Sequence, residues 1–227
     1  MKKTLLAGLA IGMMMLGMAG MASATTITYG GTPLDGIQTS SKVGAQVETF
    51  NGVSSTPVSV ASATGLDQPW TWSGSALVEP AGTNIPGDTA APAGDLSQFL
   101  SVPNPLSSGF VTAFLGGGLY NYFGLFWGSV DAYNTITFLN GVNVTESFTG
   151  QDVLTPNVAN GNQVAPETNL YVNFNDLNPF DSFRLTSTNF AFELDNAAVA
   201  PVPEPATMFL LGTGLVGLVG ARRKKKA

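Results

Sequence analysis

The side chains of this sequence that could take part in chemistry are almost all carboxylic acids and hydroxyls. The 227 residues include fifteen Asp and Glu and nine Lys and Arg, but no His and no Cys. The chain therefore has no Ser-His-Asp or Cys-His nucleophile system, no thiolate or imidazole zinc ligand and no disulfide. Lys42 is not in a Ser-x-x-Lys arrangement, because Thr39 lies three residues before it. A glycoside hydrolase needs only two carboxyl groups. Because some pair is inevitable among fifteen acidic residues, the presence of a pair is no evidence for this activity. We therefore predict no catalytic activity.

One segment has the residue types of a saccharide site. Trp127, Asp131, Tyr133 and Asn134 lie within eight residues of each other. An aromatic ring can stack on a sugar while Asp and Asn bind its hydroxyls, so these four are candidate glycan contacts. The alternative, which we favour, is that Trp127 and Tyr133 are core aromatics and that residues 128–131 form a turn capped by Asp131. Exposure of the Trp127 ring distinguishes the two.

Glu193 and Asp195 are candidate calcium ligands. Calcium takes oxygen ligands, and a strongly acidic protein outside the cell would attract it. The sequence contains no Asp-x-Asn-x-Asp-Gly loop that would specify a site, so no metal ligand set is assigned. The alternative, which we favour, is that Asp195 and Asn196 form a turn that ends a strand. We therefore predict that the protein has no cofactor, and calcium is the alternative.

The elements that must position these residues are β-strands. Apolar residues alternate with polar or small ones in several short segments, as half-buried strands require. These segments are residues 57–60, 70–72, 135–138, 183–186 and 190–194. Asn140-Gly141 between two such runs predicts a two-residue hairpin turn. We predict an all-β fold, a single β-sandwich of jelly-roll type.

Large apolar residues are concentrated in the later part of the chain. Of the 21 aromatic residues before the C-terminal tail, 16 lie from Phe110 to Phe192. Phe99 is the one aromatic residue of residues 73–109, and this segment also contains five prolines. We therefore expect a long loop or an irregular edge there. Residues 25–72 have too few large apolar side chains to form their own core. We therefore expect the early strands to pack onto the later half, in one domain.

The N-terminal end has the pattern of a bacterial secretory signal. Lys2 and Lys3 precede an uncharged apolar run over residues 5–21, which is followed by the small residues Ala22 and Ala24 on either side of Ser23. We expect export through the Sec translocon and cleavage by signal peptidase after Ala24. Seventeen apolar residues are also close to a spanning length, so a retained membrane helix is the alternative.

The C-terminal end has three parts. Val202, Pro203, Glu204 and Pro205 precede the uncharged residues 206–221. The basic residues Arg222, Arg223, Lys224, Lys225 and Lys226 follow. A helix over residues 205–221 would rise about 25 Å, close to the thickness of a bilayer core. The positive-inside rule keeps the basic cluster in the cytoplasm, so the acidic body is expected across the inner membrane.

Charge separates the body of the chain from its two ends. Between Lys3 and Arg222 the only basic residues are Lys42 and Arg184, but all fifteen acidic residues lie there. This part of the chain therefore has a formal charge of −13. Two cations cannot neutralise a row of phosphates, so nucleic acid is excluded as a partner.

The Pro-Glu-Pro motif, the apolar segment and the basic end together closely resemble the PEP-CTERM sorting signal. The resemblance implies that Glu204 is a recognition handle for an exosortase, an intramembrane cysteine protease-like transpeptidase. It also implies an exported protein of a Gram-negative bacterium that makes extracellular polysaccharide. A tail anchor that is never processed is the alternative.

Two segments of the body are similar to motifs of a family of exosortase-dependent surface proteins. Residues 122–136 contain Trp127-Gly128-Ser129, Asp131 and Tyr133-Asn134, and are similar to a GLYWGSxDxYN-type signature. Residues 191–196 are similar to an AFExDN-type motif. That family has no assigned biochemical activity, so the resemblance implies a cellular location and a fold but no mechanism.

We therefore divide the chain into a signal peptide (1–24), an extracytoplasmic β-sandwich domain (25–201) and a sorting signal (202–227). The expected function is a structural or adhesive role at the cell surface or in the extracellular matrix, associated with exopolysaccharide or biofilm, after processing of a membrane-anchored precursor. The alternatives are a lectin-like carbohydrate-binding module, with or without calcium, and a glycoside hydrolase.

Overall fold

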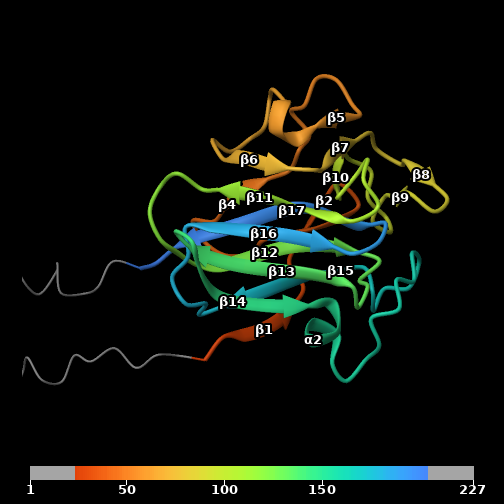
Figure 1. Ribbon diagram of the computed structural model, residues 1–227. Coiled ribbons are helices and arrows are strands. Elements are labelled where there is room, and N and C mark those ends of the chain that lie inside the picture. The colour runs from red at the N-terminus through yellow and green to blue at the C-terminus, as the bar shows by residue number, and fades with distance from the viewer. Residues whose placement is uncertain (1–23, 204–227) are drawn as a thin grey trace, which may run out of the picture.

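The computed structural model describes residues 24–203, which form two β-sheets packed face to face (Figure 1). The predicted signal helix and sorting helix lie outside these residues. All of the strand pairs are antiparallel, and many neighbours in a sheet are far apart in the sequence. The predicted all-β sandwich is confirmed.

The larger sheet, called the large sheet below, has eight strands. In spatial order they are β1 (Thr26–Tyr29), β15 (Leu170–Asn175), β12 (Tyr120–Gly128), β17 (Phe192–Pro201), β10 (Phe99–Val102), β7 (Leu77–Glu79) and β5 (Val58–Ser59), with β4 (Gln46–Glu48) also paired to β17. The C-terminal strand β17 is thus an inner strand of this sheet.

The second sheet, the small sheet, has five strands. They are, in spatial order, β14 (Asn143–Thr149), β13 (Asn134–Asn140), β16 (Ser182–Ser187), β11 (Gly109–Phe114) and β6 (Thr71–Gly74). Two short ribbons are formed by β2 (Thr32–Leu34) with β3 (Ile37–Thr39), and by β8 (Asn84–Ile85) with β9 (Thr89–Ala90). The helical elements are η1 (Val60–Ser62) and α2 (Gly150–Leu154), and within residues 24–203 no helix is long and apolar enough to cross a membrane.

The core between the sheets is built from aromatic rings. Phe123 on β12 is fully buried, and its ring centroid lies 4.6 Å from that of Phe183 and 5.4 Å from that of Phe138, both on the small sheet. Phe174 on β15 lies 6.2 Å from it on the same sheet. These are the distances at which tilted and edge-to-face ring pairs are favourable. The alternation of apolar and polar residues read from the sequence over residues 135–138 and 183–186 thus places one side of β13 and of β16 in this cluster.

The early part of the chain packs onto the later part, as predicted. Strand β1 pairs with β15, β4 with β17 and β6 with β11. The expectation of a loop or irregular edge over residues 73–109 is wrong for β10. This strand is completely buried between β17 and β7. Its pairing with β17 joins residues about ninety positions apart, which composition within the segment does not reveal.

The hairpin between β13 and β14 forms one residue later than expected. Asn140 pairs with Asn143, so the two-residue turn consists of Gly141 and Val142. Gly141 has φ +59°, whereas Val142 has an ordinary negative φ. A positive φ at the first central position alone is the pattern of a type II′ turn, which favours glycine there.

The predicted strand end at Asp195-Asn196 is wrong, because β17 continues to Pro201. The register against β12 shifts by one residue between Asp195 and Ala198, and Asn196 adopts φ +52°. This is a β-bulge, in which an extra residue on one strand bends the strand without ending it. Asn is one of the few residues that tolerate a positive φ, which is why the same residue suggested a turn.

Replacing Phe123 by Ala tests the aromatic core. We expect Phe123→Ala to lower the free energy of unfolding by about 3–5 kcal/mol, because it removes a fully buried ring from a close-packed cluster. Urea denaturation of the purified protein measures this. The exposed ring of Phe110 provides the control, and Phe110→Ala should cost less than about 1 kcal/mol. Equal losses for the two variants would contradict this description of the core.

Candidate functional site

The ring of Trp127, predicted as a candidate glycan contact, lies in the core. Its side chain is completely buried and stacks on Phe192, with ring centroids 4.4 Å apart and planes 13° apart. A sugar cannot reach a ring in this position, so the proposed role of Trp127 as a binding platform is corrected. The structure agrees with the alternative reading, in which Trp127 is a core aromatic.

Two of the other three candidate glycan contacts, Tyr133 and Asn134, hold neighbouring backbone in place. The Tyr133 hydroxyl donates to the carbonyl of Phe190 (2.9 Å), and the Asn134 amide donates to the carbonyl of Ala191 (3.2 Å). Burial raises the pKa of Asp131, which is half-buried, and a Cβ on Gly161 would lie 2.2 Å from the Asp131 carboxylate. The geometry favours a structural role for Tyr133 and Asn134, whereas Asp131 lies closely against Gly161.

The two body motifs found in the sequence contact each other. Gly128 pairs with Glu193, and the Ser129 hydroxyl lies 3.1 Å from a Glu193 carboxylate oxygen. A Cβ on Gly128 would lie only 2.9 Å from Pro92, so this position accommodates only glycine where the segment after β9 crosses the sheet. The motifs therefore join β12, β17 and that crossing segment.

Glu193 and Asp195, the candidate calcium ligands, point to the outer side of the large sheet but are covered there. They are 3% and 0% exposed. Glu193 accepts hydrogen bonds from the Ala90 amide (3.0 Å) and from Ser129, whereas Asp195 contacts Ser97 and its neighbour Asn196. The two carboxylates thus belong to separate networks. Among residues 24–203 no three acidic side chains come close enough to hold a metal ion, so the geometry does not support the calcium hypothesis.

Asp195 and Asp95 share a single hydroxyl group. The Ser97 Oγ lies 2.6 Å from a carboxylate oxygen of Asp95 and 3.0 Å from one of Asp195. A hydroxyl has one proton, so it can donate to only one of two ionised carboxylates, and the second contact requires a proton on a carboxyl group. Burial raises the pKa of Asp95 to about 6 and that of Asp195 well above its ordinary value. Burial likewise raises the pKa of Glu193 to about 7.

The outer side of the small sheet, called the open face below, carries a surface that the sequence did not reveal. Its members point away from the core and come from all five strands. In three rows across the sheet they are Thr149, Thr135, Thr186 and Phe110; then Ser147, Thr137, Arg184, Thr112 and Ser73; then Val144, Leu139, Ser182, Phe114 and Thr71. Thr112, Leu139 and Ser182 are buried, and the other eleven are at least partly exposed. Of these fourteen side chains none is acidic, and Arg184 is the one cation.

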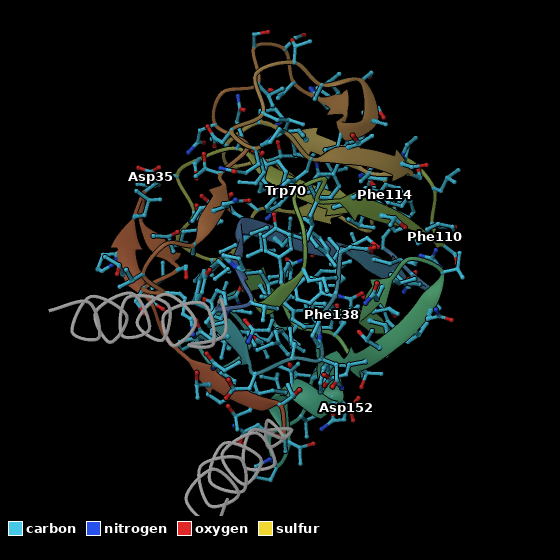
Figure 2. The ribbon with its side chains drawn as sticks, turned by 90° about the vertical axis from the view of Figure 1, so that its left-hand side faces the viewer. Asp35, Trp70, Phe110, Phe114, Phe138 and Asp152 are labelled. Atoms are coloured by element: carbon cyan, nitrogen blue, oxygen red, sulfur yellow. The ribbon has the colours of Figure 1, made fainter. Side chains whose placement is uncertain are left out.

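Arg184 is held at the centre of the open face. Its guanidinium lies 4.4 Å from the centre of the Phe110 ring, and its Nε donates to the Thr112 hydroxyl (3.1 Å). Phe110 and Phe114 are 46% and 48% exposed, on the outer edge of the sandwich in Figure 2. Two rings four residues apart on one strand are separated by about 13 Å. The arrangement offers flat apolar area, an oriented cation and many hydroxyls, which suits an extended polar chain better than a small molecule.

The buried acids predict how stability depends on pH. Asp and Glu titrate near pH 4 in unfolded chains. Because folding raises the pKa of Asp95 to about 6 and of Glu193 to about 7, the stabilisation is complete below about pH 4 and is lost as the pH rises through 6 and 7. We expect a higher Tm at pH 5 than at pH 8 in thermal unfolding.

Glu193→Gln should reduce this difference and raise the Tm at pH 8, because the amide keeps an acceptor for Ala90 without a charge. The exposed Glu167 provides the control for the loss of one negative charge, and Glu167→Gln should keep the pH dependence. A wild-type Tm that rises from pH 5 to pH 8 would contradict the prediction.

The sorting motif predicted from the sequence begins where the described residues end. Strand β17 runs to Pro201, the Val202 amide donates to the Leu119 carbonyl (3.0 Å), and Glu204, Pro205 and the five basic residues lie outside the described residues. Comparison with known families matches residues 201–224 to the PEP-CTERM protein-sorting motif. No curated protein matches the chain. This C-terminal signal identifies the chain as a PEP-CTERM protein, exported as a membrane-anchored precursor and processed by exosortase.

Proposed function

We propose that this chain has a structural or adhesive role at the cell surface or in the extracellular matrix, where it associates with extracellular polysaccharide. The sorting motif accounts for export and processing. The observation that carries the proposal for the body is the open face, with Arg184 between the exposed rings of Phe110 and Phe114. No catalytic step is included.

The charge distribution favours a polysaccharide on the open face. Most of the molecule is strongly acidic, so it repels a polymer that carries carboxylates. None of the fourteen side chains of the open face is acidic, and the one acid at its edge, Asp181, already accepts from the Gly141 amide and the Ser182 hydroxyl. The one charged group of the face is a cation that is oriented by a ring and a hydroxyl. Hydroxyls of Thr and Ser can donate to and accept from sugar hydroxyls, and exposed rings provide apolar area for the sugar faces.

A module with one defined saccharide site is the second candidate. A hollow on the outer side of the large sheet is lined by Tyr29, Lys42, Tyr122, Asn173 and neighbouring small residues. Lys42, the only other cation of the described residues, lies 5.3 Å from the centre of the Tyr122 ring. The Tyr122 hydroxyl and the Asn173 side chain already bond to each other at 2.7 Å, which leaves fewer free polar groups than on the open face.

A hydrolase has less support. Its two carboxyl groups would have to reach the scissile bond together. Glu193 and Asp195, the acids next to each other on one side of β17, are almost fully buried and bonded to the protein. We therefore do not propose this activity.

Exosortase processing is tested by the intact mass of the protein in cells with and without the exosortase. We expect normal cells to contain a species that lacks residues 206–227, because cleavage near the Pro203–Pro205 motif removes the apolar segment and the basic end. Cells without the enzyme should keep the longer species. The proposal fails if normal cells also keep residues 206–227.

Binding to polysaccharide is tested by co-sedimentation of the purified processed protein with extracellular polysaccharide from the cells that secrete it. We expect Arg184→Gln and Phe114→Ala each to weaken binding by about tenfold, the loss of one good contact. Lys42→Gln removes the same charge on the opposite side and serves as the matched control. Loss of binding only in Lys42→Gln would instead support the defined site, and unchanged binding in all three variants would refute both.

A further inference from the structure

The chain leaves the folded domain beside the loop that joins β11 to β12. Pro201 pairs with Tyr120, and the Val202 amide donates to the carbonyl of Leu119. The uncharged segment predicted to span the membrane begins at Ala206, four residues after Val202. Four extended residues reach at most about 14 Å. In the anchored precursor, the bilayer is therefore never far from this end of the sandwich.

The surface at this end, called the C-terminal pole below, is apolar. A groove there is lined by the residue 114–119 loop, the Gly141-Val142 turn and Asp181-Ser182. Phe114, Leu119 and Val142 are 48%, 44% and 92% exposed. Gly116, Gly117 and Gly118 have no side chains that would hold a flat partner away. Figure 2 looks onto this end of the molecule.

Charge does not prevent contact with a membrane at the C-terminal pole. The acid in the groove, Asp181, accepts from the Gly141 amide and from the Ser182 hydroxyl, both at 2.9 Å. These bonds stabilise the turn that presents Val142. An exposed valine at a hairpin tip, next to a partly exposed leucine and phenylalanine, has the composition of a shallow interfacial contact.

We propose that the C-terminal pole rests on the bilayer surface while the precursor is still anchored. This inference rests on the anchored precursor that the sorting motif implies. Phe114 and Ser182 belong to both the pole and the open face, so the docked precursor covers this edge of the open face until processing. The docked domain would hold the end of β17 close to the membrane surface, which is where an intramembrane enzyme has to meet the motif that follows this strand in the sequence.

The contact is expected to exist only before processing. Three partly exposed apolar side chains bury little area, at about 25 cal/mol per Å², so the free domain binds membranes weakly. A short tether raises the effective concentration to about the millimolar range, which makes a weak contact sufficient. Cleavage removes the tether, and the pole is then released.

The absence of cysteine makes this testable with a single label. Val142→Cys, carrying an environment-sensitive fluorophore, reports on the pole in the full-length precursor reconstituted in vesicles of neutral phospholipid. Val158→Cys is the matched control, because Val158 is 66% exposed and follows α2 at the opposite end, where Ala132 bonds to Ala159. We expect a blue shift and several-fold stronger quenching by nitroxide-labelled lipid at position 142 than at position 158.

Three outcomes separate the alternatives. If labelled position 142 in vesicle-bound precursor behaves like position 158, the docking proposal is wrong. If position 142 responds only when exosortase is added to the vesicles, the pole contacts the enzyme and the proposal is also wrong. Flotation of the vesicles tests anchoring separately, so a precursor that fails to float overturns the anchored state itself. Removal of residues 206–227 should abolish the signal at position 142.

Discussion

The rest of the structure depends on the pairing of β17 inside the large sheet. This strand contacts β12 along most of its length, β10 at its start and β4 near its end. The other strands of the large sheet are separated from it by at most two neighbours. Phe192 and Leu194 bring core side chains from the same strand. Because β17 ends at Pro201, next to the sorting motif, the sandwich cannot close until almost the whole exported chain is available.

Much of the fold could be predicted because its signals are local. Alternation in residues 135–138 and 183–186 identified β13 and β16, and glycine at position 141 identified the hairpin to within one residue. The position of β10 could not be predicted, since its burial comes from strands distant in sequence. Asn196 shows a second limit of prediction from the sequence. An asparagine with a positive φ can occur in a turn or in a β-bulge, and only the register against the partner strand distinguishes the two.

The candidate site was harder to predict than the fold for the same reason. Tryptophan and glutamate are residue types that often bind ligands or take part in catalysis. In this protein, however, the side chains of Trp127 and Glu193 are enclosed by segments from elsewhere in the chain. The open face is assembled from five strands, each of which contributes only two or three ordinary residues. Phe110 and Phe114 were recognisable as aromatic, but nothing near them in the sequence shows that they point outward. The unequal covering of the two sheets decides which side chains remain accessible.

Both ends of the described domain lie at one pole. At the N-terminal end, the Thr25 hydroxyl donates to Glu146, which also accepts from the Asn178 amide. Two residues later, Phe180 pairs with Tyr120, next to the point where Val202 leaves the sheet. Another domain with both ends at one pole could therefore replace this one between the same signal peptide and sorting signal. In the docked precursor that we propose, a reporter domain inserted at the opposite end, near α2, would be displayed farthest from the membrane.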